Sequence, residues 1–310
     1  MASTGFQSTS LTGWSSGTLV KMAAITASGI TIKASERIMS PAVAGLLVRA
    51  TSSSSQTAPK FDCLAIGETV WVMPTIETLA RHDGPRGEVV LRRRLDGVRE
   101  AEELIINGVF AMDSTETSTE YLLGELAIPS GHAQRVLIGG LGLGYTASAI
   151  SAQEIAEIDV VEIEQCLIDW AHQGVTGRLA AIASDPRIRL HTGDVRLVLQ
   201  GQCDALGGPW DAIVLDVDNG PDFLIHGQNR ALYTGEVLRA AYAQLAAGGT
   251  LAIWCQSAAP MLRAVLEGMA PSTREHVIEG SRGERRVRYV IYTVSRPPYS
   301  LSEARQECAP

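Results

Sequence analysis

The sequence predicts an α/β protein with a mostly parallel sheet, preceded by a small β-rich domain. From Arg135 onwards, short apolar runs alternate with helix-like segments, as in a sheet whose strands are joined by helices. A glycine-rich turn at 139–144 joins the first of these runs to the first helix. Residues 61–128, in contrast, consist largely of β-rich runs around turn-prone dipeptides. These three observations set the fold class and the order of the two domains.

Residues 1–60 differ in composition from the rest. They contain twenty Ser or Thr and a single acid, Glu36, which is typical of an organelle transit peptide. The alternatives are a disordered leader or a true start further along, at Met22, Met39 or Met73. We expect a cytoplasmic protein, or a plastid or mitochondrial one if this segment directs import.

The predicted β-rich domain, 61–128, has strands over 88–95 and 103–110 and a helix over 118–128. Asn107-Gly108 is expected to add a tight turn or a bulge. A nucleoside-binding domain over 129–296 and a tail over 297–310 follow. In the larger domain, strands are predicted at 135–140, 157–163, 187–192, 211–217, 250–255 and 287–294. Helices are predicted from 147, over 166–173, over 235–245 with a C-cap at Gly248-Gly249, and over 260–269.

Composition excludes several classes of partner. The 310 residues are 45% hydrophobic and 19% charged, an ordinary globular balance. The formal net charge of −8 argues against nucleic-acid or anionic-membrane surfaces, which require basic patches, and suits a cationic acceptor. The five cysteines and six histidines show no metal-ligand spacing, so we expect free thiols and no metal.

The glycine-rich turn is the candidate donor-binding loop. Glycines let the backbone turn sharply and approach a ligand with no Cβ in the way. Glu162 ends the second predicted strand, where a carboxylate can accept both hydroxyls of a ribose, although a solvated strand-end acid is the alternative. The residues expected to bind the nucleoside are Gly139, Gly140, Leu141, Gly142, Gly144 and Glu162.

Two further acids follow the next strands. Asp194, with Val195 after it, follows the third predicted strand, and Asp216 ends the fourth. Ligands of open parallel sheets bind beyond the carboxyl ends of the strands, so these acids and the loop should converge on one rim. The loop does not match the dinucleotide fingerprint, no ATP-binding P-loop occurs, and many acids disfavour a pyrophosphate. A cationic sulfonium donor fits this rim better.

These residues resemble the spermidine synthase family, the polyamine aminopropyltransferases and their relatives, over about 88–295. The resemblance is carried by the segments 107–110, 161–164, 193–194, 215–218 and 232–233. It implies a class I methyltransferase-like (Rossmann-like) fold with a mostly parallel seven-stranded sheet, and S-adenosylmethionine or its decarboxylated form as co-substrate. It also implies that Glu162 holds the ribose, that Asp194 holds the adenine amino group and that Asp216 faces the reacting amine.

Several positions depart from the family pattern. Gly142 stands where the family has an Asp that grips the donor's aminopropyl amine, which favours intact S-adenosylmethionine and hence methyl transfer. Plant putrescine N-methyltransferases are similar in lacking that Asp and in an aromatic–Thr pair like Tyr145-Thr146. On the acceptor side, Ala111 stands for a Gln and Glu120 for a Tyr. The second acid of the family's Asp-Ser-Ser-Asp-Pro segment lies one place earlier here, at Asp218.

Alkyl transfer from a sulfonium is an in-line displacement at carbon, so alignment of the acceptor is the main task. Asp216 or Asp218 is the candidate to bind an acceptor ammonium and to take or relay its proton, and Tyr233 is the candidate to orient it. The alternatives are that Asp216 only fixes its loop and that Tyr233 only packs. Asp113, Glu116 and Glu120 are expected either to gate the pocket or to be solvated helix acids.

Three functions are therefore open. The first is methyl transfer from S-adenosylmethionine to a small, amine-type acceptor such as a polyamine. The second is aminopropyl transfer from the decarboxylated donor, and the third is a catalytically silent nucleoside-binding member. Relatives in this family often pair as dimers, which leaves a homodimer open.

Overall fold

The computed structural model describes residues 8–15, 18–27, 30–39, 43–51, 62–66, 69–72, 74–282 and 285–298, with side chains over 74–280 and 286–298. The chain divides into two compact units. One unit comprises Met1–Glu77 and Arg93–Ala101, and the other comprises Thr78–Arg92 and Glu102–Pro310. The second unit contains the whole predicted nucleoside-binding domain.

The first unit contains a six-stranded antiparallel sheet in the order β1-β2-β3-β4-β5-β6. Its strands are β1 (Ser8–Ser15), β2 (Thr18–Ala27), β3 (Ile30–Met39), β4 (Val43–Thr51), β5 (Asp62–Ile66) and β6 (Thr69–Val72). The sequence boundary expected at residue 61 falls between β4 and β5. That residues 1–60 act as a leader stays a prediction, and the end of the expected tail, 299–310, lies outside the described residues.

Four further strands form a second antiparallel sheet, in the order β10-β9-β8-β7. They are β7 (Thr75–Gly84), β8 (Gly87–Asp96), β9 (Arg99–Ile106) and β10 (Val109–Asp113). The predicted strand 103–110 is thus two strands, because Asn107 and Gly108 both have positive φ and form the tight turn between them. This turn directs β10, and with it Met112, toward the larger sheet's glycine loop.

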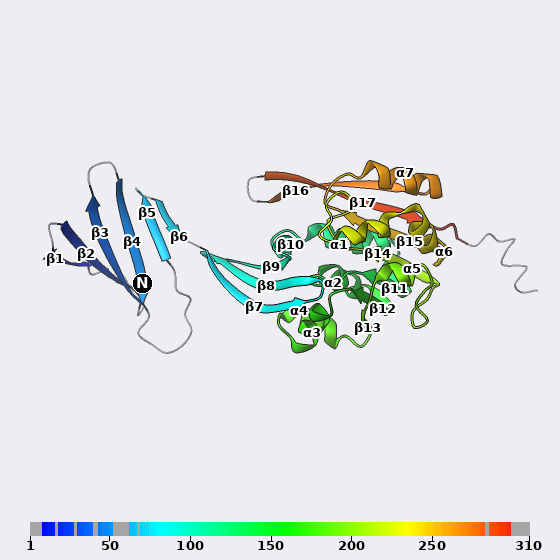
Figure 1. The fold of residues 1–310 in the computed structure, drawn as a ribbon, viewed down its shortest axis with the longest axis horizontal. Helices are drawn as coiled ribbons and strands as arrows, with labels where there is room; N and C mark the ends of the chain where they lie inside the picture. Colours follow the sequence, from blue (N-terminus) through cyan, green and yellow to red (C-terminus); the bar gives the residue numbers. More distant parts are fainter. Residues whose placement is uncertain are drawn as a thin grey trace, which may run out of the picture. The chain divides into compact units, whose positions relative to one another are not determined.

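The second unit is built on a seven-stranded sheet in the order β13-β12-β11-β14-β15-β17-β16 (Figure 1). The strands are β11 (His132–Gly139), β12 (Glu154–Glu162), β13 (Ile188–Thr192), β14 (Trp210–Leu215), β15 (Leu245–Cys255), β16 (Arg274–Arg282) and β17 (Arg285–Ser295). The first five run parallel, and the β16–β17 hairpin adds two antiparallel strands. The predicted, largely parallel α/β sheet is therefore confirmed.

Helices cover this sheet on both faces. They are α1 (Ser118–Ala127), α2 (Tyr145–Ser151), α3 (Gln165–Gln173), α4 (Gly177–Ser184), α5 (Val195–Leu199), the 3₁₀ helix η1 (Gly227–Tyr233), α6 (Gly235–Ala243) and α7 (Pro260–Met269). Side chains of successive residues in a strand point to opposite faces. In β11, Val136 and Ile138 pack into the core under α1–α4, whereas Leu137 packs into the core under α5–α7.

The C-terminal end of one helix, α6, differs from the prediction. The helix expected to run to 245 ends at Ala243, with Gln244 as its C-cap, because the Gln244 amide side chain donates to Val198 and Leu199 carbonyls and the chain turns directly into β15. Gly248, expected at that cap, lies within β15 with φ +81°. Four further elements were not predicted from the sequence: α4, α5, η1 and β16.

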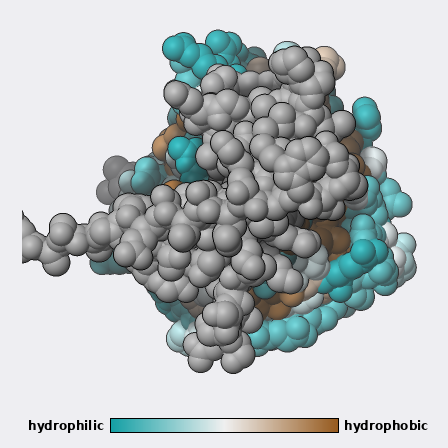
Figure 2. Space-filling view, turned by 90° about the vertical axis from the view of Figure 1, so that its left-hand side faces the viewer, coloured by the Kyte–Doolittle hydropathy of each residue, from teal (hydrophilic) through white to brown (hydrophobic). Residues whose placement is uncertain are grey.

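Both hydrophilic and hydrophobic residues reach the described surface. Where residues are coloured in Figure 2, teal hydrophilic areas are more extensive than brown hydrophobic ones. Large apolar side chains that stay exposed belong to separate elements, among them Val98, Phe223 and Met261. None of the helices in the described part of the chain is both long enough and apolar enough to span a membrane.

Candidate active site

A cavity of about 350 Å³ opens beyond the carboxyl ends of β11, β12, β13 and β14. Four predicted site residues line it, one from the end of each of these strands: Gly140, Glu162, Asp194 and Asp216. Gly142, Val195 and Asp218 also line it, whereas Gly139, Leu141, Gly144 and Tyr233 do not. The structure thus brings the glycine loop and the three strand-end acids together, as the order of the strands requires.

Gly140 allows the loop to approach the neighbouring strand. Its φ is +94°, and a Cβ there would lie 2.2 Å from the carbonyl oxygen of Asp216. The Asp216 amide donates to the Gly139 carbonyl at 2.9 Å, which fixes the two segments against each other. A residue with a side chain would have to separate them.

The other loop residues pack beneath the cavity rather than lining it. Gly139 lies against Val195, and Gly144, the left-handed N-cap of α2, lies against Ile182 of α4. The Leu141 side chain is buried. These residues support the loop from below and give it its shape, while Gly140 and Gly142 face the ligand space.

Gly142, where the family resemblance places an Asp, faces the end of β10. A Cβ at Gly142 would lie 2.7 Å from Sδ of Met112. The same sulfur accepts a hydrogen bond from the Leu143 amide at 3.3 Å. The methionine therefore fills the space that a longer side chain at position 142 would need.

Glu162 is held in place by backbone amides. The Leu141 amide donates to Oε2 at 2.7 Å, and the Glu164 amide donates to Oε1 at 2.8 Å. Burial raises the pKa of the Glu162 carboxyl, against the opposing effect of these hydrogen bonds. Each oxygen retains a lone pair for a ligand hydroxyl, as a ribose-binding carboxylate requires.

Asp194 is the N-cap of α5, and its Oδ1 accepts from the Arg196 amide at 2.9 Å. Its Oδ2 lies 3.2 Å from Nη2 of the Arg196 guanidinium. The carboxylate remains partly exposed to the cavity, so it can still accept a hydrogen bond from a ligand amino group. The buried Val195 next to it offers an apolar contact to a flat ring.

Asp216 lies opposite Glu120 of α1, and both carboxyls line the cavity. Oδ2 of Asp216 accepts from the Thr146 hydroxyl at 2.6 Å, and Oε2 of Glu120 accepts from the Thr119 hydroxyl at 2.6 Å. Burial raises the pKa of Asp216. Burial and the charge of Asp216 raise the pKa of Glu120 to about 7. Of the predicted gating acids, Glu120 and Glu116 line the cavity, whereas Asp113 does not and instead accepts from Thr115.

Asp218 organises the loop after β14. Its carboxylate accepts hydrogen bonds from the amides of Asn219, Ile225 and His226 and from the Asn229 side chain, at 2.6 to 3.3 Å. Its own φ is +67°, a conformation that Asp adopts more readily than most residues. These contacts occupy the acceptor positions of the carboxylate, so Asp218 is a loop-fixing residue in this structure rather than a free base.

Tyr233 has a similar supporting role. Its ring is buried in the core under α5–α7, and its hydroxyl donates to the Val217 carbonyl at 2.6 Å. It contacts the loop from behind and does not line the cavity. The structure therefore places it in the packing role that the sequence analysis gave as the alternative. Burial raises its pKa well above the ordinary value.

Several lining residues were not singled out from the sequence. Arg86, in the β7–β8 turn, reaches Oε1 of Glu164 at 3.0 Å. Nε2 of His226 is buried without a hydrogen-bond partner among the described residues, with the same oxygen 3.6 Å away. Trp254 and Tyr289, with ring centroids 5.7 Å apart, add an aromatic wall. Only Glu164 carried a sequence signal, since it follows the ribose acid in the segment 161–164.

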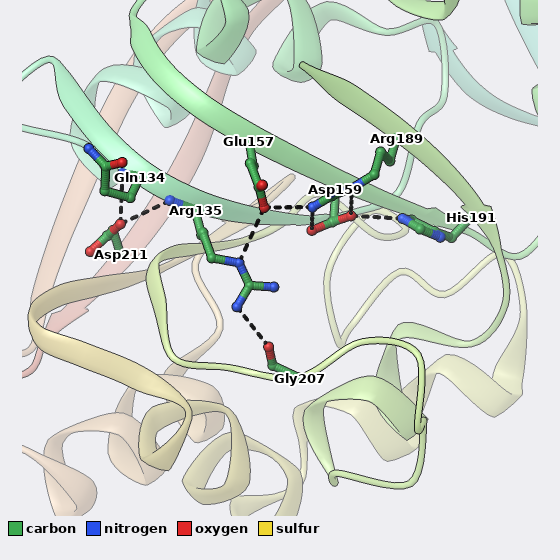
Figure 3. A network of polar contacts seen from close by, with 8 residues as sticks. All are labelled: Gln134, Arg135, Glu157, Asp159, Arg189, His191, Gly207 and Asp211. Carbon is green, nitrogen blue, oxygen red and sulfur yellow. Dashed lines mark hydrogen bonds and ion pairs between the residues drawn. The ribbon is translucent and has the colours of Figure 1, made fainter. Parts of the chain in front are cut away.

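A second polar network lies on strands β11–β14 and lines no part of this cavity (Figure 3). Its centre is Asp159 of β12, whose fully buried side chain pairs with Arg189 at 2.8 Å and contacts His191 at 2.8 Å. Those hydrogen bonds lower the pKa of Asp159, although burial alone would raise it. We assign this network to sheet stability. Within the described ranges, no group of three or more His, Cys, Asp or Glu residues is arranged to hold a metal ion.

The fold and the cavity together define the class of protein: an α/β protein with a largely parallel seven-stranded sheet and an acid-lined cavity at the carboxyl edge of that sheet. Solved structures share this fold. A spermidine synthase in complex with the transition state analogue AdoDATO gives a TM-score of 0.59 at 14% identity, covering 73% of this chain and 76% of that chain. The spermidine synthase of Thermotoga maritima gives 0.57 at 13% identity, covering 73% and 75%.

Sequence comparison points to the same family. The chain is 30% identical over 132 residues to a polyamine aminopropyltransferase from Nitrosomonas europaea, a match that covers 42% of this chain and 38% of the relative. The matched part is thus well under half of that curated relative's length. No protein-family profile matches the chain. The similarity to the spermidine synthase family that the sequence indicated is confirmed by these relatives.

Proposed function

We propose that this chain transfers the aminopropyl group of decarboxylated S-adenosylmethionine to an amine acceptor of the polyamine class. The observation that carries this proposal is the charge of the cavity. Seven carboxyl side chains line it, against two arginines, Arg86 and Arg196, and each arginine is ion-paired with a lining acid. A donor and an acceptor that are both cations match such a cavity.

This charge balance reverses the preference for methyl transfer that Gly142 suggested. An intact S-adenosylmethionine carries a carboxylate, which needs a positive partner in the pocket. The two lining arginines already neutralise Glu164 and Asp194, so a donor carboxylate would have to compete with these acids for the arginines. The decarboxylated donor carries only positive charges on its sulfonium and amine. The relatives reported above, which are named as aminopropyltransferases or spermidine synthases, support the same choice.

The position of each acid in the cavity indicates which part of the substrates it would bind. Glu162 and Asp194 suit the ribose and the adenine amino group of the donor, as the family resemblance implies. Asp216, at the end of β14, suits the ammonium of the acceptor. The protein's main contribution is to align the acceptor nitrogen with the sulfur–carbon bond, which can lower the barrier by roughly 7–11 kcal/mol. The product nucleoside is neutral at sulfur, so the acidic cavity holds it less strongly than the donor.

The test combines binding and product identity. Calorimetry should give tighter binding for decarboxylated S-adenosylmethionine than for the intact donor, with methylthioadenosine binding detectably. Incubation with putrescine or a longer polyamine should then give a product whose mass has grown by an aminopropyl group. The Asp216→Asn variant should bind methylthioadenosine normally and lose turnover, whereas Glu125→Gln, on the exposed side of α1, should behave as the wild type.

Methyl transfer from intact S-adenosylmethionine is the second candidate, favoured by Gly142. It predicts the opposite order of donor affinities and a product heavier by a methyl group. Binding of methylthioadenosine without turnover of any donor and amine would instead support a catalytically silent nucleoside-binding protein. Either result would contradict aminopropyl transfer.

A further inference from the structure

We propose that Glu120 and Asp216 form a carboxyl pair that divides the handling of the acceptor amine: Asp216 holds the ammonium and Glu120 takes its proton. This inference rests on the proposed function and assigns a further catalytic residue within the same cavity. It differs from the expectation that Asp216 or Asp218 is the base and that Glu120 only gates the pocket.

The position of Glu120 in the fold is the first argument. It lies in the first turn of α1, on the face that also carries Leu123, Gly124 and Ala127, and all four are buried. A carboxyl group on the buried face of a helix is costly unless it is paired or protonated. Only 6% of Glu120 is exposed, yet it lines the cavity. The helix therefore presents this acid to the ligand space and not to bulk solvent.

The hydrogen bonds of the pair are the second argument. One oxygen of each carboxyl accepts from a threonine hydroxyl, Thr119 for Glu120 and Thr146 for Asp216. The other oxygen of Asp216 accepts no hydrogen bond from the described residues, and Asp216 lines the cavity, so this oxygen is available to a ligand. The threonines thus each hold one oxygen of a carboxyl, and both carboxyl side chains line the cavity in which an ammonium would bind.

Asp218 and Glu120 have different surroundings, and these give them different roles. The Asp218 carboxylate accepts four hydrogen bonds, so it could act as a base only by giving up the contacts that hold its loop in place. The charged groups that act on Glu120 are Asp216, after β14, and Glu116, ahead of α1. Both are acids, and both make Glu120 hold a proton more strongly. A carboxylate with a pKa near 7 is a better base than an ordinary one, and about half of it is ionised at neutral pH.

The chemical step balances without any further reactant. The acceptor ammonium gives one proton to the Glu120 carboxylate and becomes a neutral amine. The nitrogen lone pair forms a bond to the aminopropyl carbon while the carbon–sulfur bond breaks, and its electron pair returns to sulfur. The product amine carries the positive charge, and Asp216 remains ionised beside it. Glu120 then releases its proton to solvent through the open cavity.

The test is a pH profile of kcat/KM for the amine in the wild type and in Glu120→Gln, with Glu120→Asp and Glu125→Gln as comparisons. In the wild type, kcat/KM should fall as the pH is lowered through about 7, because Glu120 becomes protonated. Glu120→Gln should lower kcat by roughly 100-fold or more and remove this step from the profile. Glu120→Asp should keep the step at reduced rate, and Glu125→Gln should match the wild type.

Two controls separate failure of this inference from failure of the proposed function. Methylthioadenosine affinity, measured by calorimetry, should be the same in all variants, which shows that each is folded. Infrared difference spectra across the neutral range should show a carboxyl that titrates in the wild type and is missing in Glu120→Gln. An active wild type whose rate and pH profile survive in Glu120→Gln, or lack of that titrating carboxyl, overturns the inference. A wild type that transfers no aminopropyl group but shows the titration contradicts the proposed function instead.

Discussion

The replacement Glu162→Gln is nearly isosteric, yet the structure predicts that it is disruptive. Both carboxylate oxygens of Glu162 accept from backbone amides, those of Leu141 and Glu164. A glutamine has one carbonyl oxygen and one amino group. Whichever way its amide is turned, the amino group faces a backbone N–H that also donates. One hydrogen bond is therefore lost, and one buried donor is left without an acceptor.

The size of the effect follows from these contacts. Leaving a buried donor unsatisfied costs about 1–3 kcal/mol. A loss of about 2 kcal/mol corresponds to a fall in Tm of roughly 4–8 °C for a domain of this size. Nucleoside binding should weaken as well, because hydrogen bonds to a charged acceptor contribute about 1.5–3 kcal/mol each. Methylthioadenosine affinity should therefore drop roughly 10- to 100-fold.

The assay is thermal unfolding and calorimetric titration of methylthioadenosine on the same preparations. Glu154→Gln is the matched control, since Glu154 is on the same strand but exposed and outside the cavity. It should change neither quantity appreciably. A Glu162→Gln variant with wild-type Tm would refute the argument that both oxygens are committed to amides. Unchanged affinity with lowered Tm would remove Glu162 from the nucleoside site.

Three further predictions concern supporting positions. Asp218→Ala removes four hydrogen bonds and places an alanine at a positive φ, which alanine adopts less readily than Asp. We therefore expect rapid proteolysis of the loop after β14 and a higher KM for the amine. A variant that is cleaved at the wild-type rate would contradict this. Asp159→Asn should cost about 1.5–3 kcal/mol in chemical denaturation at neutral pH, because it removes a charged hydrogen-bond acceptor from Arg189 and His191. Because the folded pKa of Asp159 lies below its ordinary value, its contribution is complete above that value and is lost as the pH falls through the lowered pKa, so wild type and variant should converge in acid. Gly140→Ala should abolish methylthioadenosine binding by pushing the glycine loop away from the backbone at Asp216, whereas Gly201→Ala, also left-handed but in open space, should only lower the Tm slightly.

The parts of the fold that the sequence predicted are those with buried, continuous patterns. The strands β11, β12 and β14 are apolar over most of their length because helices cover both of their faces, and their boundaries were predicted to within a few residues. The hairpin strand β16 was missed because its residues, Arg274–Arg282, are largely polar, and those over 274–280 are half-exposed, as is usual at the edge of a sheet. Short α5 has only five residues, too few for a helical period to be visible.

In the candidate site, too, some residues could be predicted from the sequence pattern and others could not. The strand-end acids could be predicted because parallel topology alone brings them to one rim. The roles of Asp218 and Tyr233 could not, because they depend on where the loop after β14 folds back, which no local pattern encodes. Glu120 was noticed as an acid but not as a buried one. Its spacing of three, four and seven residues from Leu123, Gly124 and Ala127 is the signal that could have placed it on the inner face.

Met112 and Gly142 are linked through the sulfur that fills the space beside the loop. An acid at position 142 would meet the sulfur of Met112, so the side chain at 112 would have to move aside or become smaller. We therefore expect Gly142→Asp alone to weaken donor binding, and Gly142→Asp combined with Met112→Ala to recover it in a calorimetric titration. Evolution between the two forms of this loop would then need paired substitutions, so the residue at 112 should change together with the residue at 142 among relatives.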